Sequence, residues 1–116
     1  MRVPVAYELS PGTWIPIKWL SPNDMSVEGT HAQYHADLNG GFIEASKLMP
    51  PEAVDMVICH EIRHAFWVNC GYGDLFKSLL PGLEEAINEM LDFMYRDTVQ
   101  INPDSKRFKW KEITDQ

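Results

Sequence analysis

Two histidines four residues apart flank a glutamate in the segment His60-Glu61-Ile62-Arg63-His64. Residues at positions i and i+4 lie on one face of an α-helix, so both imidazoles can reach a single ion. Neutral imidazole suits zinc, which favours tetrahedral sites. Glu61 points elsewhere on the helix and can reach a water at an open zinc position, where it can act as a general base. The spacing predicts one Zn²⁺ per chain, with two metal ligands and a base on one rigid helix.

The residues around this motif follow the pattern of a helix. Apolar side chains recur with the helical period up to about Val68. Pro50-Pro51-Glu52 suits a first turn, where proline is tolerated and an acid complements the helix dipole. Asn69-Cys70-Gly71-Tyr72-Gly73 ends the pattern, with a glycine as the expected C-cap. We therefore expect a helix over residues 50–68, with the motif in its interior.

A catalytic zinc ion requires a third protein ligand. A further helix, expected over residues 83–97, carries four acids: Glu84, Glu85, Glu89 and Asp92. Its apolar side is set by Leu83, Ala86, Ile87, Met90, Leu91 and Met94. Glu84 lies at the border of that side and can turn toward a cleft beside the core, whereas the other acids point away. Glu84 is therefore the predicted third ligand, with Glu85 left open because helix starts shift by a residue or two.

The remaining segments predict an α+β fold with a small sheet. Residues 15–20 form a plausible strand, and residues 29–38 and 42–48 form a hairpin around Asn39-Gly40-Gly41. Residues 74–80 predict a short helix. We expect a single domain over residues 1–116, with an irregular arm at 1–14 and a polar tail at 104–116. The sheet should pack on the motif helix and the C-terminal helix.

This arrangement resembles the compact gluzincin-type zinc peptidases, and in particular small HExxH proteins of phage and prophage regions, ImmA-like domains and SprT-like domains. The resemblance covers about residues 15–103, and its matching pieces are Ile17–Leu20, Tyr34–Asp37, Phe42–Ala45, Pro50–Glu52, Cys59–Ala65 and Leu83–Asn88. It implies a minimal zincin-like fold and a glutamate ligand on the later helix. Glu84 with Asn88 four residues on is similar to the family pattern, in which a polar residue orients a histidine ligand.

Composition narrows the setting and the partners. The net charge of -7 and pI of about 4.9 disfavour nucleic acid and anionic membranes as partners. No segment approaches the roughly 20 apolar residues of a membrane helix. The two cysteines do not make a disulfide framework, and the N-terminus lacks the apolar stretch of a signal peptide. We expect a reducing, cytoplasmic setting, which is the host cytoplasm if the protein is encoded by a phage.

Five further residues could contribute chemistry. His31 and His35 are four apart on a probable strand, about 13 Å along it, which is too far for one ion. Either could line the cleft, although exposed strand histidines are the simpler interpretation. Tyr72 and Tyr95 are possible oxyanion donors. Cys70 stands alone after a helix and is more typical of a structural cysteine.

Two functions remain open at this point. The first is a zinc metallopeptidase that hydrolyses a peptide bond, with Glu61 activating water and the substrate adding to a sheet edge at residues 30–38 or 42–48. The second is a zinc-binding domain that recognises a protein partner without general proteolysis. A purely structural zinc site is disfavoured, because such sites are closed by four protein ligands and are often rich in cysteine.

Overall fold

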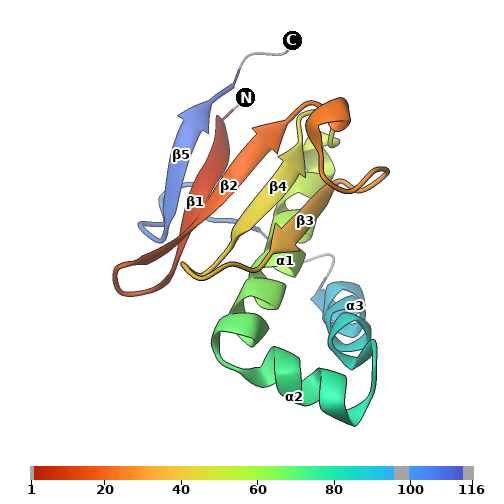
Figure 1. The fold of residues 1–116 in the computed structure, drawn as a ribbon. Coiled ribbons are helices and arrows are strands. Elements are labelled where there is room, and N and C mark those ends of the chain that lie inside the picture. The colour runs from red at the N-terminus through yellow and green to blue at the C-terminus, as the bar shows by residue number, and fades with distance from the viewer. Residues whose placement is uncertain (1, 96–99, 114–116) are drawn as a thin grey trace.

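The structure is a computed structural model that describes residues 2–95 and 100–113. Within these residues, five strands form one mixed sheet with the order β3-β4-β2-β1-β5 (Figure 1). The strands are β1 (Arg2–Ser10), β2 (Thr13–Leu20), β3 (Ala32–His35), β4 (Phe42–Ser46) and β5 (Phe108–Glu112). β2 and β4 are parallel, and the other neighbouring strands are antiparallel. The α+β class predicted from the sequence is confirmed.

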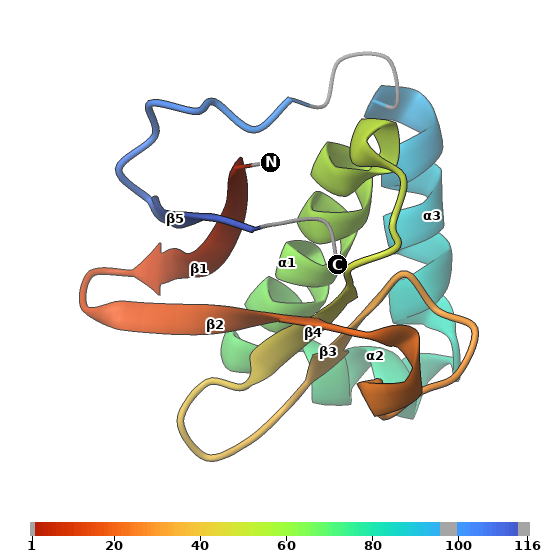
Figure 2. The same ribbon diagram turned by 90° about the horizontal axis from the view of Figure 1, so that it is seen from above.

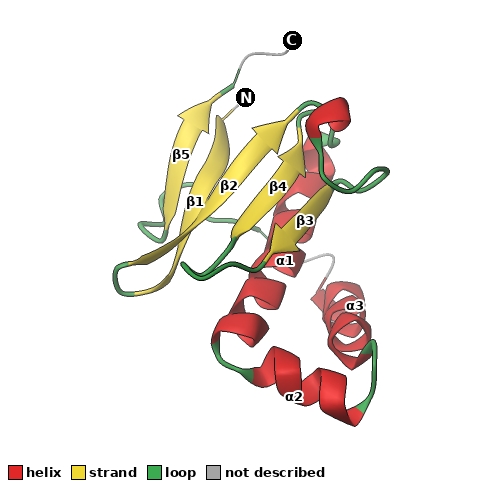
Figure 3. Cartoon of the chain, in the orientation of Figure 1, coloured by secondary structure: helices red, strands yellow, loops and turns green. Residues whose placement is uncertain are grey.

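Three α-helices complete the described fold (Figure 3). A 3₁₀ turn, η2 (Pro51–Ala53), leads into α1 (Val54–Asn69), which is followed by α2 (Tyr72–Leu79) and α3 (Leu83–Tyr95). A second 3₁₀ turn, η1 (Pro22–Asp24), follows β2. α1 packs against the sheet as predicted (Figure 2). The prediction that the sheet also packs on the C-terminal helix is wrong, because α3 packs mainly against α1 and α2. The predicted helices over 50–68, 74–80 and 83–97 are confirmed, although 96 and 97 lie outside the described residues.

The core lies between α1 and the middle of the sheet. Alternation along β2 turns Ile15 and Ile17 inward, and β4 contributes Ile43 to the same face. Ile58 of α1 packs into this cluster, and Ile15, Ile43 and Ile58 are all 0% exposed. Burial of one such side chain stabilises the fold by roughly 1.5–3 kcal/mol. The packing fixes α1, and therefore the motif, relative to the sheet.

The predicted hairpin is confirmed, and it forms the end of the sheet nearest the motif. β3 and β4 are antiparallel, with Tyr34 opposite Ile43. β3 is the edge strand, because β4 has β2 on its other side. Gly41 closes the turn with φ of 88°, and a Cβ there would lie 2.4 Å from the His35 carbonyl oxygen and from the Tyr34 hydroxyl. Only glycine fits this close approach.

The predicted irregular arm at 1–14 and polar tail at 104–116 are wrong, because both segments contribute strands. β1 pairs with β2 on one side and with β5 on the other. Pro4 is accommodated where the pairing with β5 shifts register between Pro4 and Ala6. In β5, aromatic and lysine residues alternate, and the Phe108 ring lies 4.9 Å from the Tyr7 ring. This period of two is the signal for a strand.

The predicted apolar side of α3 is only partly buried, because Leu83, Ile87 and Leu91 are half-buried but Ala86, Met90 and Met94 are exposed. Asn88 is fully buried, whereas Met90, Phe93 and Met94 are 54%, 72% and 61% exposed. The helix is therefore rotated so that its partly polar side, which carries Glu84, Asn88 and Asp92, faces α1. This rotation determines which acids meet the histidines.

Candidate metal centre

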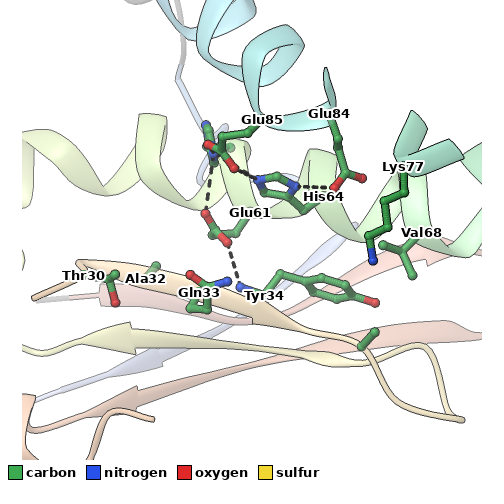
Figure 4. Close-up of a pocket in the computed structure, with 12 residues that line it drawn as sticks. Thr30, Ala32, Gln33, Tyr34, Glu61, His64, Val68, Lys77, Glu84 and Glu85 are labelled. Atoms are coloured by element: carbon green, nitrogen blue, oxygen red, sulfur yellow. Dashed lines mark hydrogen bonds and ion pairs between the residues drawn. The ribbon is translucent and has the colours of Figure 1, made fainter. Parts of the chain in front are cut away.

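α1 carries the glutamate and the two histidines of the motif on two different faces. Its buried residues Val54, Ile58, Glu61 and Ala65 follow the helical period and face the sheet. Successive residues are turned by about 100°, so His60 and His64 lie on a neighbouring face that looks toward α3. Both histidine side chains are 14% exposed. One helix thus brings Glu61 to the sheet edge and both imidazoles to α3 (Figure 4).

The Nε2 atoms of His60 and His64 converge on the carboxylate of Glu85. They lie 2.8 Å from Glu85 Oε1 and 2.9 Å from Glu85 Oε2, respectively, and 3.2 Å from each other. Ligand atoms of a tetrahedral zinc site, each about 2.0–2.2 Å from the metal, are roughly 3.3–3.5 Å apart. Zinc would therefore require the carboxylate to move outward by only about half an ångström. The three residues fit a zinc ion in number, type and spacing.

Carboxylates also lie behind both imidazoles. Nδ1 of His60 is hydrogen-bonded to Asp92, and Nδ1 of His64 lies 3.2 Å from Glu84 Oε2. A carboxylate at Nδ1 favours the tautomer with the proton on that nitrogen, which leaves the Nε2 lone pair for a metal. In that tautomer, two nitrogen lone pairs and the oxygens of Glu85 face one another without a proton between them. A divalent cation at their centre would offset this repulsion.

The structure changes the predicted roles of the acids on α3. Glu84 was the predicted ligand, but its carboxylate lies at Nδ1 of His64, and Glu85 meets both Nε2 atoms. Asp92, expected to point into solvent, contacts His60. Asn88, expected near a histidine, accepts a hydrogen bond from Trp67 Nε1 at 3.1 Å. The rotation of α3 places Glu84, Asn88 and Asp92 against α1, and the flanking Glu85 reaches the histidines from the rim.

A second residue of the motif helix holds Asp92 in place. The Arg63 guanidinium forms an ion pair with the Asp92 Oδ1 atom, while Oδ2 contacts His60. The Asp92 side chain is 21% exposed and that of Arg63 is 23% exposed, so the pair is partly shielded from water. Together with the bond between Trp67 and Asn88, these contacts fix α3 to α1 through polar groups. Sequence analysis assigned no role to Arg63, although its position one turn after His60 and next to His64 placed it near the motif.

Glu61 bridges the motif helix and the sheet edge. Its Oε1 atom accepts a 2.7 Å hydrogen bond from the backbone N–H of Tyr34 in β3. Its Oε2 atom lies 3.8 Å from His60 Nε2, beside the candidate metal position. Burial raises the pKa of the Glu61 carboxyl, and the Tyr34 hydrogen bond and the two histidines offset part of that rise. A raised pKa suits a base that accepts a proton near neutral pH.

A cleft of about 590 Å³ runs between the motif helix and β3. Its walls include Ala32 and Tyr34 from β3, with Val68 and Lys77 on the helical side (Figure 4). Ala36, just after β3, also lines the cleft. A smaller pocket of about 190 Å³ adjoins it at the other end and shares Ala32, His60 and Glu61 with the cleft. The two spaces form a path past the histidines along the edge strand.

The two histidines that were expected on the strand, His31 and His35, lie apart from the pair in the motif. His31 lines the smaller pocket with Met56 and Val57, so it flanks the cleft. Nε2 of His35 lies 2.8 Å from Glu44, which also accepts hydrogen bonds from the N–H and Oγ of Ser26. Burial tends to raise the pKa of Glu44, but these three hydrogen bonds hold it below its ordinary value. His35 thus belongs to a separate polar cluster.

Of the other candidates, Tyr72 and Cys70 are not among the described residues that line the cleft. Tyr72 is 48% exposed and packs its ring against Trp67 and Phe76. Cys70 is a free, exposed cysteine at the end of α1. The Tyr95 side chain lies outside the described part of the structure. None of these residues gains support as an oxyanion donor or a metal ligand.

Comparisons of the chain with protein-family models, with curated proteins and with solved structures found no match. The geometry of the site therefore carries the functional argument. None of the described helices combines the length and the apolar character needed to cross a bilayer.

Proposed function

We propose that this chain is a zinc-dependent metallopeptidase with a minimal zincin-like fold. One observation carries the proposal: Nε2 of His60 and of His64 converges with Glu85, and a carboxylate stands behind each Nδ1 atom. If the HExxH pattern occurred on the helix by chance, there would be no reason for acids of a second helix to surround its histidines. Three protein ligands leave a fourth zinc position for water, which is the arrangement of catalytic sites.

Glu61 is suitably placed to act as the base. Bound zinc would polarise the substrate carbonyl and lower the pKa of its water to about 7. The Oε2 atom of Glu61 faces the histidines and can take the proton of that water, while Oε1 stays on the Tyr34 N–H. The same carboxyl can then return the proton to the leaving amine. The hydrogen bond to β3 keeps the side chain oriented throughout.

The free edge of β3 supports a peptide as the substrate. The carbonyl of His31 accepts a 2.8 Å hydrogen bond from Ser46 N–H, so the backbone N–H and C=O groups of the odd-numbered residues in this segment point toward β4. The backbone groups of the even-numbered residues point away from β4, and the hydrogen bond from Tyr34 N–H to Glu61 is one example. Because Glu61 occupies the Tyr34 N–H, an extended peptide can pair with the remaining outward groups of this segment beside the histidines. Of the two strands left open by the sequence, β3 is favoured, because β4 is paired on both sides.

A zinc-binding interaction domain is the second candidate. It is favoured by apolar side chains exposed on the two later helices, namely Leu79, Leu80, Phe93 and Met94. Exposed apolar residues on neighbouring helices are typical of protein-binding surfaces. In this alternative, zinc orders the two helices and Glu61 has only a structural role at β3.

The variant Glu61→Gln separates the two candidates. The zinc-loaded protein is incubated with a broad peptide library, and new termini are counted by mass spectrometry. We expect hydrolysis by the wild type and a loss of at least about 100-fold in Glu61→Gln with zinc retained, because an amide is a poor proton acceptor. Glu52→Gln, at an exposed glutamate in η2, is the matched control. Equal hydrolysis by wild type and Glu61→Gln would reject the base, and no hydrolysis by zinc-loaded wild type would favour the interaction domain.

A further inference from the structure

One positively charged side chain stands out in an acidic cleft. Glu61, Glu84 and Glu85 all line the cleft, and Lys77 is the single lysine or arginine among its described lining residues. Lys77 belongs to α2, which contributes no other residue to that lining. Its ammonium group extends from α2 toward β3, on the side of His64 where Tyr34 lies (Figure 4). The lysine thus marks one end of the substrate path.

The ammonium group of Lys77 has no acidic partner among the described residues. Within the described part of the chain, its side chain forms no ion pair or hydrogen bond with an acidic group. Glu84 lines the same cleft, but its Oε2 atom lies at His64 and its buried Oε1 atom has no hydrogen-bond partner. A lysine that served only to neutralise the cleft would pair with this carboxylate. The ammonium is instead available to a group that enters the cleft.

We propose that Lys77 is a specificity residue that binds a carboxylate of the peptide substrate at the side of the cleft where Val68 lies (Figure 4). This inference rests on the proposed function, because it takes β3 as the strand on which the peptide pairs. Alternate side chains of a paired peptide point to the same side, so residues two apart can turn toward α2. The carboxylate can belong to an acidic side chain or to the free C-terminus of a short peptide.

Peptide hydroxamates test the proposal, because a hydroxamate chelates zinc and fixes the peptide's position. Two series carry the hydroxamate at the C-terminal or the N-terminal end, with Glu, Gln or Lys scanned over the first four positions. In the second series, the far end is either an amide or a free carboxylate, which distinguishes the two sources. Affinities are measured for zinc-loaded wild type, Lys77→Ala and Lys77→Glu. Lys111→Ala, at an exposed lysine in β5, is the control.

At one position we expect the wild type to prefer Glu, or the free carboxylate, by about 3- to 5-fold, as for a charge pair with an exposed lysine. The preference should fall below about twofold in Lys77→Ala, persist in Lys111→Ala and change to a preference for Lys in Lys77→Glu. The same preference in Lys77→Ala, or none in the wild type, would overturn the proposal while leaving zinc binding intact. A Lys77-dependent preference without peptide hydrolysis would support Lys77 and reject the peptidase. Absence of hydroxamate binding would reject both.

Discussion

The two layers around α1 are held by different kinds of contact. On the sheet side, Ile15, Ile43 and Ile58 are 0% exposed and form a closed apolar core. On the side of α3, the residue buried most completely is Asn88, and Asn88 and Asp92 make polar contacts to α1. Apolar burial determines where α1 lies on the sheet. Polar contacts to the motif residues determine where α3 lies on α1.

This difference would link folding to the proposed metal binding in one layer only. Glu84, Glu85 and Asp92 bring three carboxylates to two histidines and one arginine. Like charges at this spacing repel unless a cation lies among them. Zinc bound by residues of α1 and α3 would join the two helices directly. The sheet and α1 need no such link, because their contact is already dry and closely packed.

The largest expected effect is on the sheet side. Ile58→Ala removes a fully buried side chain and leaves a cavity, so it should lower the free energy of unfolding by about 2–5 kcal/mol. Met90→Ala is the matched change on α3, where the side chain is 54% exposed, and it should change stability by less than about 0.5 kcal/mol. Urea denaturation of both variants measures the difference. Similar losses in the two variants would show that α3 is packed as tightly as the sheet layer.

Removal of zinc should have a smaller and local effect. With a chelator, we expect amide hydrogens of α3 to exchange at least about tenfold faster, whereas those of β2 and β4 should change little. Hydrogen exchange followed by mass spectrometry resolves these elements. The His60→Ala, His64→Ala double variant serves as a control, because its exchange should not respond to zinc. A uniform response over sheet and helices would contradict the division into two layers.

The elements near the motif were predictable because their sequence signals are local. Periodicity and the proline-rich start predicted α1, and Asn39-Gly40-Gly41 predicted the hairpin that places β3 beside it. The end strands were missed because Pro4 obscured the alternation of β1, and the aromatic-lysine alternation of β5 was taken for a polar tail. Pairing of β1 with both β2 and β5 is a long-range property that composition does not reveal.

The sequence argument that favoured Glu84 over Glu85 relied on an orientation of α3 that differs from the structure. The prediction assumed that Met90 and Met94 face the core, which turned Glu85 and Asp92 toward solvent. In the structure those methionines are exposed, because His60, His64 and Arg63 offer α3 a polar surface instead of an apolar one. Helix amphipathicity predicts a packing face only when the opposing surface is apolar. The motif histidines could be predicted from spacing alone, whereas their partners depend on this surface.

Zinc affinity in single variants tests the proposed centre most directly. We expect about one zinc per wild-type chain and loss of tight binding in His60→Ala, His64→Ala and Glu85→Gln, because each removes a proposed ligand. Glu84→Gln and Asp92→Asn alter groups behind the histidines and should weaken binding by about 10- to 100-fold. Competition with a chromophoric chelator measures each value. Wild type without zinc, or Glu84→Gln losing zinc while Glu85→Gln retains it at full affinity, would contradict the centre described between α1 and α3.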